Sequence, residues 1–529
     1  MKSLIGFLSS LVLIASAISP ASSSSAADKL IECIANNNIN PSSFQTIFNP
    51  ESSLFSLLLQ SRVQNLRYIN STTKPLLILT PSDDTQIQSA VLCSREQGIE
   101  IRARCGGHDY EGISYLSDKP YIVIDLFNLN EVQVDVKEEM AWVQSGAQLG
   151  ELYYAIARQS THLAFPAGLC PTVGVGGHFG GGGFGTLVRK YGLAADNVID
   201  AYLMDARGRI LNRKAMGEEV FWAIRGGGAG SFGIVLSWKV KLVRVPQKLT
   251  YFTVTKTLEE GANKLIHQWQ RFAHDVHEDL FVRILLLNVG GGDDKKKKTV
   301  QANFQALFLG TKERVIPLMN KSFPELGLKA ENCTEGTWAD SVLNFAGFKP
   351  GVPPEVLLDK TQMFKAKFKA KTDFVTEPVL ESAFEGIWKM MLEEDVPIVI
   401  LEPLGGKMNK IPESYTPFPH RKGHLYNIQY LVKWDKNGKE EEERHLEWMK
   451  RLYDYMEPHV SKSPRAAYLN YRDLDIGMNS AGGKTSFSEA SVWGQRYFRD
   501  NFKRLTEVKG MFDPENFFRN EQSIPLLHM

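Results

Sequence analysis

The chain has 529 residues, which is too many for one hydrophobic core of ordinary size, so we expect two or three domains. Its composition, 43% hydrophobic and 23% charged, is ordinary for a soluble globular protein. A formal net charge of +1, without a stripe of basic and aromatic residues, gives no reason to expect a nucleic-acid partner.

Residues 1–25 have the layout of a secretory signal peptide. One lysine precedes an apolar run that reaches about Ile18, and small residues follow, so we expect cleavage close to Ser24. The run is too short and too rich in serine to span a membrane, and no later segment approaches a membrane span. The protein is therefore predicted to be secreted to the apoplast or cell wall, or to reach the vacuole.

Three glycosylation sequons agree with export, although each is a weak signal by itself. They begin at Asn70, Asn320 and Asn332. Together with the N-terminal segment they predict a secreted glycoprotein.

The chain has five cysteines, an odd number for an oxidising compartment. Cys33 and Cys93 both lie in helical surroundings, and we expect a disulfide between them that ties the N-terminal segment to the first domain. Cys105, Cys170 and Cys333 remain. No CxxC motif is present and the histidines are scattered, so the sequence predicts no metal site.

Residues 76 to about 245 alternate short apolar strands with helices, which predicts an α+β or α/β domain. IEIRAR, YIVIDL and MAWVQSG are typical of strands, whereas DDTQIQSAVLCSREQG and QLGELYYAIARQS are typical of helices. From about 250 to 460, longer runs such as LFVRILLLNV and HLYNIQYLVKW predict an antiparallel sheet with a helix against it. A final segment from about 465 returns to short loops.

Glycine is concentrated in three clusters of the first half. Two glycines stand directly before His108, where they permit positive φ and close approach of the backbone to a partner. The cluster Gly228–Gly233 has the form GxGxxG, but it stands between a helix and a strand, the reverse of the dinucleotide-binding order, so we reject a Rossmann site. So many glycines still suggest backbone N–H groups that face a phosphate or a flat cofactor.

Cys170 lies in the second glycine cluster and resembles His108 in its exposed setting. One interpretation is a buried cysteine beside a glycine loop. The other is a pair of nucleophiles, an imidazole and a thiolate, directed at one electrophilic cofactor. A flavin is such a cofactor, since histidine attacks its 8α-methyl group and a thiolate attacks C6.

Four long motifs carry a family resemblance: RARCGGHDYEG, FPAGLCPTVGVGGHFGGGGFG, YLNYRDLDIG and DPENFFRNEQSI. They resemble motifs of the plant berberine bridge enzyme-like family, FAD-linked oxidases of the vanillyl-alcohol-oxidase superfamily, and the resemblance covers residue 30 or so to the end. It implies an α+β architecture. An FAD-binding domain of two subdomains (26–250) would be followed by an antiparallel-sheet substrate domain backed by helices (251–465). A C-terminal segment (466–529) would return to the FAD domain.

The resemblance implies that FAD is bound by two covalent bonds, from His108 to the 8α-methyl group and from Cys170 to C6. It also implies further residues around the cofactor, most of them glycines. These are Gly106, Gly107, Gly112, Val173, Gly174, Gly176, Gly177, Gly230, Gly233, Asn470 and Asn516. In relatives, valine at the position of Val173 accompanies efficient reduction of O₂ and leucine accompanies poor reduction, so Val173 predicts an oxidase that forms hydrogen peroxide.

The candidate catalytic residues are Asn427, Gln429 and Tyr471. Strand periodicity places Asn427 and Gln429 on one face, and we favour a polar pocket floor over an amide ladder to neighbouring strands. Tyr471 matches the tyrosine that acts as base in relatives, although a hydroxyl capping a loop is the alternative; Arg472 is expected to point away from it.

Two departures from the family leave the base open. Berberine bridge enzyme has a glutamate base where this chain has Gln429. Monolignol oxidoreductases have an activating lysine and a second tyrosine where this chain has Asn427 and Phe184.

The sequence thus predicts a monomeric secreted flavoprotein that oxidises a small specialised metabolite, alcohol or carbohydrate by hydride transfer to flavin N5, with O₂ as the second substrate. One alternative is an FAD-containing cyclase that performs oxidative ring closure or cycloaddition. Another is a non-enzymatic secreted protein for defence or carbohydrate binding.

Overall fold

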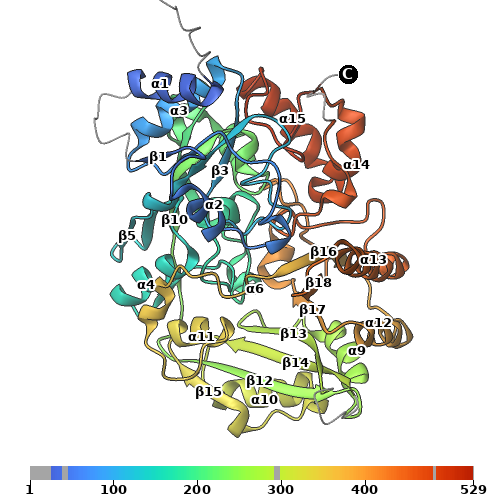
Figure 1. Ribbon diagram of the computed structural model, residues 1–529. Helices are drawn as coiled ribbons and strands as arrows, with labels where there is room; N and C mark the ends of the chain where they lie inside the picture. Colours follow the sequence, from blue (N-terminus) through green and yellow to red (C-terminus); the bar gives the residue numbers. More distant parts are fainter. Residues whose placement is uncertain (1–24, 38–45, 291–297, 481–483, 528–529) are drawn as a thin grey trace, which may run out of the picture.

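The computed structural model describes residues 25–37, 46–290, 298–480 and 484–527, which Figure 1 shows. The predicted signal peptide, apart from its last residue, lies outside the described residues. Sheets of four and five strands belong to the first half of the chain and a seven-stranded sheet to the second, which confirms the predicted α+β class. In the described part of the chain no helix is long and apolar enough to cross a membrane.

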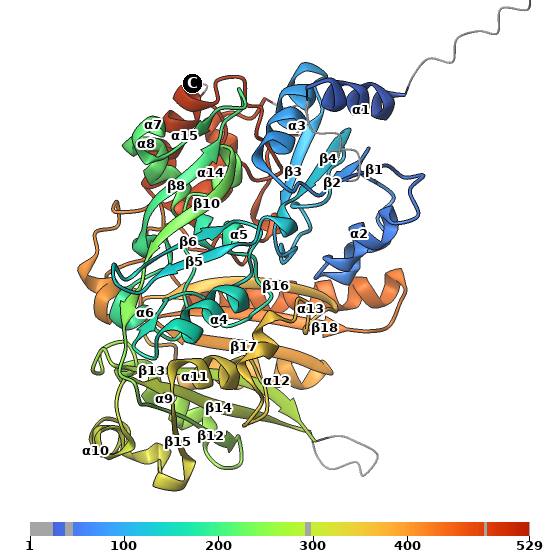
Figure 2. The ribbon, with the colours of Figure 1, turned by 90° about the vertical axis from the view of Figure 1, so that its left-hand side faces the viewer.

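The first sheet has the order β1-β2-β4-β3, in which β2, β4 and β3 are parallel and β1 is antiparallel. Helices α1 (Ala26–Asn37) and α3 (Asp84–Glu96) pack against each other beside it (Figure 2). A disulfide joins Cys33 of α1 to Cys93 of α3, so the predicted pairing is confirmed. The remaining elements here are β1 (Ile47–Phe48), α2 (Phe55–Ser61), β2 (Ile78–Leu79), β3 (Glu100–Arg104) and β4 (Tyr121–Asp125).

The second sheet is antiparallel, with the order β5-β6-β10-β8-β9. Helix α4 (Leu149–Gln159) buries Leu149, Leu152, Tyr153 and Ile156 in the core that it shares with this sheet, as its apolar spacing predicts. The strands are β5 (Val132–Asp135), β6 (Met140–Gln144), β8 (Val198–Met204), β9 (Ile210–Leu211) and β10 (Ile234–Lys241), with a separate pair formed by β7 (Leu163–Ala164) and β11 (Val243–Arg244). The short helices are α5 (Val175–Gly180), α6 (Val188–Tyr191), α7 (Arg213–Met216) and α8 (Glu218–Ile224).

The seven-stranded sheet is antiparallel, with the order β15-β12-β14-β13-β17-β18-β16, and helices cover one of its faces (Figure 1). Ile284 of β13 packs with the helices, whereas its neighbours Arg283 and Leu285 point to the opposite face, which lines a cavity. The strands are β12 (Leu249–Thr257), β13 (Leu280–Val289), β14 (Thr299–Phe308), β15 (Cys333–Gly336), β16 (Lys367–Val375), β17 (Val396–Pro403) and β18 (Tyr426–Trp434). The helices of this half are α9 (Ala262–Phe272), α10 (Lys312–Ser322), α11 (Trp338–Phe345), α12 (Glu381–Glu393) and α13 (Lys439–Met456).

The C-terminal segment leaves the large sheet and packs on the first half. Helices α14 (Phe487–Phe498) and α15 (Asn501–Phe512), red in Figure 1, lie beside the first-half elements. Their side chains Trp493 and Phe502 belong to the same apolar core as helix α4. The chain therefore returns to the first half, as the family resemblance implies.

Buried charges join the large sheet to the rest of the molecule. Lys369 of β16 contacts Glu111, in the loop between β3 and β4, and lies 2.9 Å from Asp473 of the C-terminal segment. None of the three side chains is more than 5% exposed. One cation thus holds together three segments that are far apart in the sequence.

We expect Lys369→Met to lower the free energy of unfolding by about 3–5 kcal/mol, because the carboxylate of Glu111 stays buried without its cation. Urea unfolding followed by intrinsic fluorescence measures the change. Lys450→Met is the control, since Lys450 forms an exposed pair with Asp454 and its loss should cost less than about 1 kcal/mol. Equal losses of stability in the two variants would contradict the role of Lys369 in holding the three segments together.

Candidate active site

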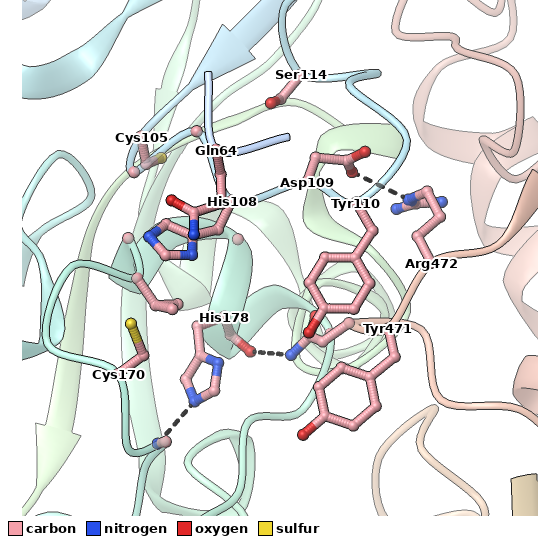
Figure 3. A pocket seen from close by; sticks show the side chains of 18 of the residues that line it. Gln64, Cys105, His108, Asp109, Tyr110, Ser114, Cys170, His178, Tyr471 and Arg472 are labelled. Carbon is pink, nitrogen blue, oxygen red and sulfur yellow. Dashed lines mark hydrogen bonds and ion pairs between the residues drawn. The ribbon is translucent and has the colours of Figure 1, made fainter. Parts of the chain in front are cut away.

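A cavity of about 670 Å³ separates the glycine-rich loops of the first half from the free face of the large sheet. Figure 3 shows side chains of the first half and of the C-terminal segment that line it. Its walls come from the loop after β3, from the glycine-rich segment around α5, from strands β13, β17 and β18, and from the C-terminal residues 468–472. The volume is typical of a small-molecule site. These segments meet only in the folded chain.

The two glycines before His108 allow two loops to pack at very short range. Gly107 has φ +69°, and a Cβ there would lie 1.8 Å from the carbonyl oxygen of Arg62. A Cβ on Gly106 would lie 2.4 Å from the backbone nitrogen of Gly174. Only glycine fits at either position, and the resulting turn brings His108 to the cavity wall.

His108 and Cys170 both line the cavity (Figure 3), and they share the neighbour Thr172, which the sequence did not single out. His108 Nε2 lies 2.9 Å from Thr172 Oγ1, and Cys170 Sγ lies 3.5 Å from the same oxygen. Burial lowers the pKa of His108 to about 4, so its imidazole is neutral and nucleophilic at neutral pH. Burial raises the pKa of the Cys170 thiol. Two candidate attachment groups therefore stand at one wall.

The predicted glycines Gly174, Gly176, Gly177, Gly230 and Gly233 also line the cavity. A Cβ on Gly177 or Gly230 would meet no described atom within 4 Å, so packing within the protein does not explain glycine there. Because these glycines have no side chains, their backbone directly borders open cavity space. This wall suits the flat ring and the pyrophosphate of FAD, so the residues present fit that cofactor.

Gly112 and Asn516 do not line the cavity, so a role for them at the cofactor stays a prediction. Gly112 has φ +74°, and a Cβ there would lie 2.9 Å from the side chain of Leu116, so its glycine serves a tight turn. Asn516 has φ +51° in the turn after α15, and Phe518 and Asn520 reach the cavity instead.

The two amides of β18 have different surroundings. Gln429 lines the cavity, and its Nε2 donates to the hydroxyl of Tyr110 at 2.5 Å. Asn427 does not line the cavity; its amide donates to Thr372 Oγ1 and to the carbonyl oxygen of Asp373, both at 2.9 Å. The pocket interpretation therefore suits Gln429 alone, and the amide-ladder alternative describes Asn427.

Tyr471 is held between an aromatic ring and a carboxylate. Its ring stacks on Tyr110, with centroids 5.7 Å apart and planes 3° from parallel. Its hydroxyl donates to Glu402 Oε2 at 3.2 Å, and Arg283 Nη1 lies 3.7 Å from Glu402 Oε1. We did not predict Glu402, Arg283 or Tyr110 from the sequence. A signal existed for the first two, because LFVRILLLNV and VPIVILEP each carry one charged residue among apolar ones.

Burial and the neighbouring Glu402 carboxylate raise the pKa of Tyr471 well above its usual value, so the residue is a neutral hydroxyl at neutral pH. Arg472 points away from it, as expected, and pairs with Asp109 at 3.2 Å (Figure 3). Phe184 contributes only an apolar ring, whose centroid lies 6.4 Å from that of Tyr471.

Asn470 and Val173, both predicted at the cofactor, line the cavity. Asn470 donates to the carbonyl oxygen of His178 at 2.9 Å and to the hydroxyl of Tyr468 at 2.8 Å. These bonds attach the C-terminal segment to the glycine-rich loop. In the described part of the chain, no group of three or more histidine, cysteine, aspartate or glutamate side chains is placed to hold a metal ion.

Comparison with known proteins gives two family models, an FAD binding domain over residues 75–213 and a berberine and berberine-like domain over residues 467–525. The chain is 53% identical to Berberine bridge enzyme-like 22 of Arabidopsis thaliana over 88% of both chains. It is 48% identical to Monolignol oxidoreductase AtBBE-like 13 of the same plant, over 98% of this chain and 97% of that one. Wild-type Phl p 4.0202, a glucose dehydrogenase, matches with TM-score 0.88 and 44% identity over 94% of this chain and 100% of that one.

We expect Gly107→Ala to lose stability and Gly177→Ala to lose FAD. The first places a Cβ 1.8 Å from a carbonyl oxygen, so we expect a loss of about 4 kcal/mol or more in the free energy of unfolding. The second removes a glycine from helix α5, where alanine is favoured by about 0.5–1 kcal/mol, but it fills cavity space. Gly177→Ala should therefore fold and carry less FAD.

Denaturant unfolding and the ratio of flavin to protein absorbance measure the two effects. Full flavin content in Gly177→Ala would contradict a cofactor against this wall.

Proposed function

The chain belongs to the berberine bridge enzyme-like family of FAD-dependent oxidoreductases, and we propose that it is a secreted oxidase whose FAD is attached through both His108 and Cys170. The observation that carries the proposal is that both nucleophiles line one cavity and share Thr172 as a neighbour. When bound, FAD supplies a two-electron acceptor that takes hydride at N5. The residues of the chain position the substrate and remove its proton.

The contacts of His108 support its part in attachment. Its Nε2 is occupied by Thr172 Oγ1 at 2.9 Å, which leaves Nδ1 for the 8α-methyl group of the flavin. Cys170 has the same hydroxyl within 3.5 Å, so Thr172 orients both side chains.

The sheet wall favours a substrate with an apolar body and one oxidisable hydroxyl group. Polar side chains stand at the two ends of this wall, Arg283, Glu402 and Gln429 beside Tyr471 at one end and Lys433 at the other, and the stretch between them is aliphatic. A sugar would need hydrogen-bond partners around its whole ring, because its hydroxyl groups lose water on binding. We therefore place a specialised-metabolite alcohol before a carbohydrate. The aliphatic side chains of the wall are Leu285, Leu287, Ile398, Ile400 and Leu431.

Several observations support secretion to the apoplast or vacuole. The disulfide Cys33–Cys93 suits an oxidising compartment, and it accompanies the signal-like N-terminus. Of the three sequons, Asn70 and Asn320 are exposed and Asn332 is half-buried, so the first two suit glycosylation best. We expect a monomer.

The cyclase alternative rests on one observation, the replacement of the relatives' lysine and glutamate by Asn427 and Gln429. Anaerobic bleaching of the flavin by a substrate separates an oxidase from a cyclase that uses FAD as scaffold, and from a protein that only binds. Cinnamyl alcohol and D-glucose are suitable first probes. Peroxide release on admitting air then separates an oxidase from a dehydrogenase.

Bicovalent attachment is tested by acid precipitation of wild type, His108→Ala, Cys170→Ala and the double variant. Each single variant retains one bond, so we expect flavin absorbance in the pellets of the wild type and both single variants. The double variant should release its flavin to the supernatant. A wild-type pellet without flavin would rule out covalent attachment.

Val173→Leu should slow reoxidation by O₂ by about tenfold or more, equivalent to a barrier about 1.4 kcal/mol higher, because the longer side chain obstructs the cavity wall next to Cys170. Reduction by the alcohol should keep its rate. Stopped-flow absorbance measures the two half-reactions separately, and equal slowing of both would contradict a role in oxygen access.

A further inference from the structure

Glu402 is a buried carboxylate that lines the cavity and that the proposed function leaves without a role. It lies near the end of β17, on the cavity face with Ile398 and Ile400, and is 5% exposed. A carboxylate is seldom buried unless it is paired and hydrogen-bonded, because removing its charge from water is costly. Its partners therefore indicate what it does.

Among the described residues, the partners of the Glu402 carboxylate are Tyr471 and Arg283. The Tyr471 hydroxyl donates to Oε2 at 3.2 Å. Arg283 Nη1 lies 3.7 Å from Oε1, while its Nε donates to Gln305 Oε1 at 2.9 Å. The arginine is thus anchored on the neighbouring strand β14 and stabilises the carboxylate as an anion without a close hydrogen bond to it.

Tyr471 by itself is a poor base. Its pKa is raised by burial and by the Glu402 charge, so it carries its proton at neutral pH. A neutral hydroxyl both donates and accepts hydrogen bonds. Tyr471 can therefore accept a proton on the cavity side only if it passes its own to Glu402.

We propose that Glu402 is the terminal proton acceptor and that Tyr471 relays the substrate's hydroxyl proton to it. This inference rests on the proposed oxidation of an alcohol. The substrate O–H bond breaks as its proton moves to Tyr471 Oη, and the Tyr471 proton moves to Glu402 Oε2. The electron pair left on the substrate oxygen forms the carbonyl bond as the carbinol C–H bond breaks. Its hydrogen leaves as hydride, and FAD is the oxidant that accepts it.

The relay explains how this chain manages without the lysine of its relatives. Asn427, at the lysine position, is bonded to Thr372 and Asp373 and supplies no charge. A carboxylate acceptor needs no cationic activation of the tyrosine, because the phenol is not required to ionise in advance.

The groups that face Glu402 limit what titrates in this site. Arg283 comes from β13, Tyr468 and Tyr471 from the C-terminal segment, and Tyr110 from the loop after β3. Burial raises the pKa of all three tyrosines, so they stay neutral. Burial also raises the pKa of Glu402, against the opposing effect of Arg283. Turnover should fall as the pH falls through the Glu402 pKa, because the protonated acid accepts no further proton.

The test compares Glu402→Gln with Glu394→Gln in the flavin-loaded protein, with anaerobic cinnamyl alcohol as the reducing probe. Glu394 is a matched control, because it is a buried carboxylate of the same half that pairs with Arg444 and lies away from the cavity. Glu402→Gln should slow flavin bleaching by about 100-fold or more and abolish the acid limb of the pH profile. Glu394→Gln should retain both, and covalent flavin content should be normal in each variant.

Unchanged bleaching in Glu402→Gln would overturn the proposal. So would a slower reaction with the wild-type pH profile, since that result would mean that Glu402 only shapes the cavity.

Infrared titration of the resting protein provides a readout that needs no turnover. As the pH falls, the spectra of the wild type and of Tyr471→Phe should each gain the carbonyl band of one more protonated acid than the spectrum of Glu402→Gln, and the difference spectrum isolates this Glu402 band. If neither cinnamyl alcohol nor D-glucose bleaches the wild type, the proposed function has failed, and the infrared result decides the inference alone. If the Glu402 band is present at every pH, the residue is permanently protonated and the inference has failed by itself.

Discussion

The buried contact of Lys369 with Glu111 and Asp473 determines how the two walls of the cavity face each other. Glu111 follows His108 in the loop after β3, and Asp473 follows Tyr471 in the C-terminal segment. Because each of these charges is costly to bury alone, the cluster is stable only when all three segments meet in one arrangement. The distance between His108 and Tyr471 therefore depends in part on Lys369, a residue that does not line the cavity.

The large sheet provides both the second core and the substrate wall by simple alternation. Residues of β13, β17 and β18 that point one way pack with α9, α12 and α13, and their immediate neighbours point into the cavity. A shift of one residue in β13 or β17 would bury Arg283 or Glu402 among the helices, and the same shift in β18 would bury Gln429. Packing of the core under the helices thus fixes the register of these strands, and this register places the polar side chains in the cavity.

The polar groups of the cavity also balance one another. Glu402 carries the negative charge that berberine bridge enzyme is expected to place at the position of Gln429, and Arg283 offsets that charge from the adjacent strand. Gln429 is then free to hold Tyr110, whose ring supports Tyr471 from one side. The cavity thus keeps a carboxylate on β17, one strand away from Gln429 of β18.

Local patterns in the sequence determined the α+β class and the strands and helices, and they singled out the candidate attachment residues His108 and Cys170, because periodicity and glycine chemistry act over a few neighbouring residues. Tertiary structure alone decided which of the polar residues meet. Gln429 reaches the cavity and Asn427 does not, although both lie on one strand face, since the cavity ends between them. Glu402 meets Tyr471 across a long stretch of sequence, and such a contact depends on strand order and register, which no local pattern encodes.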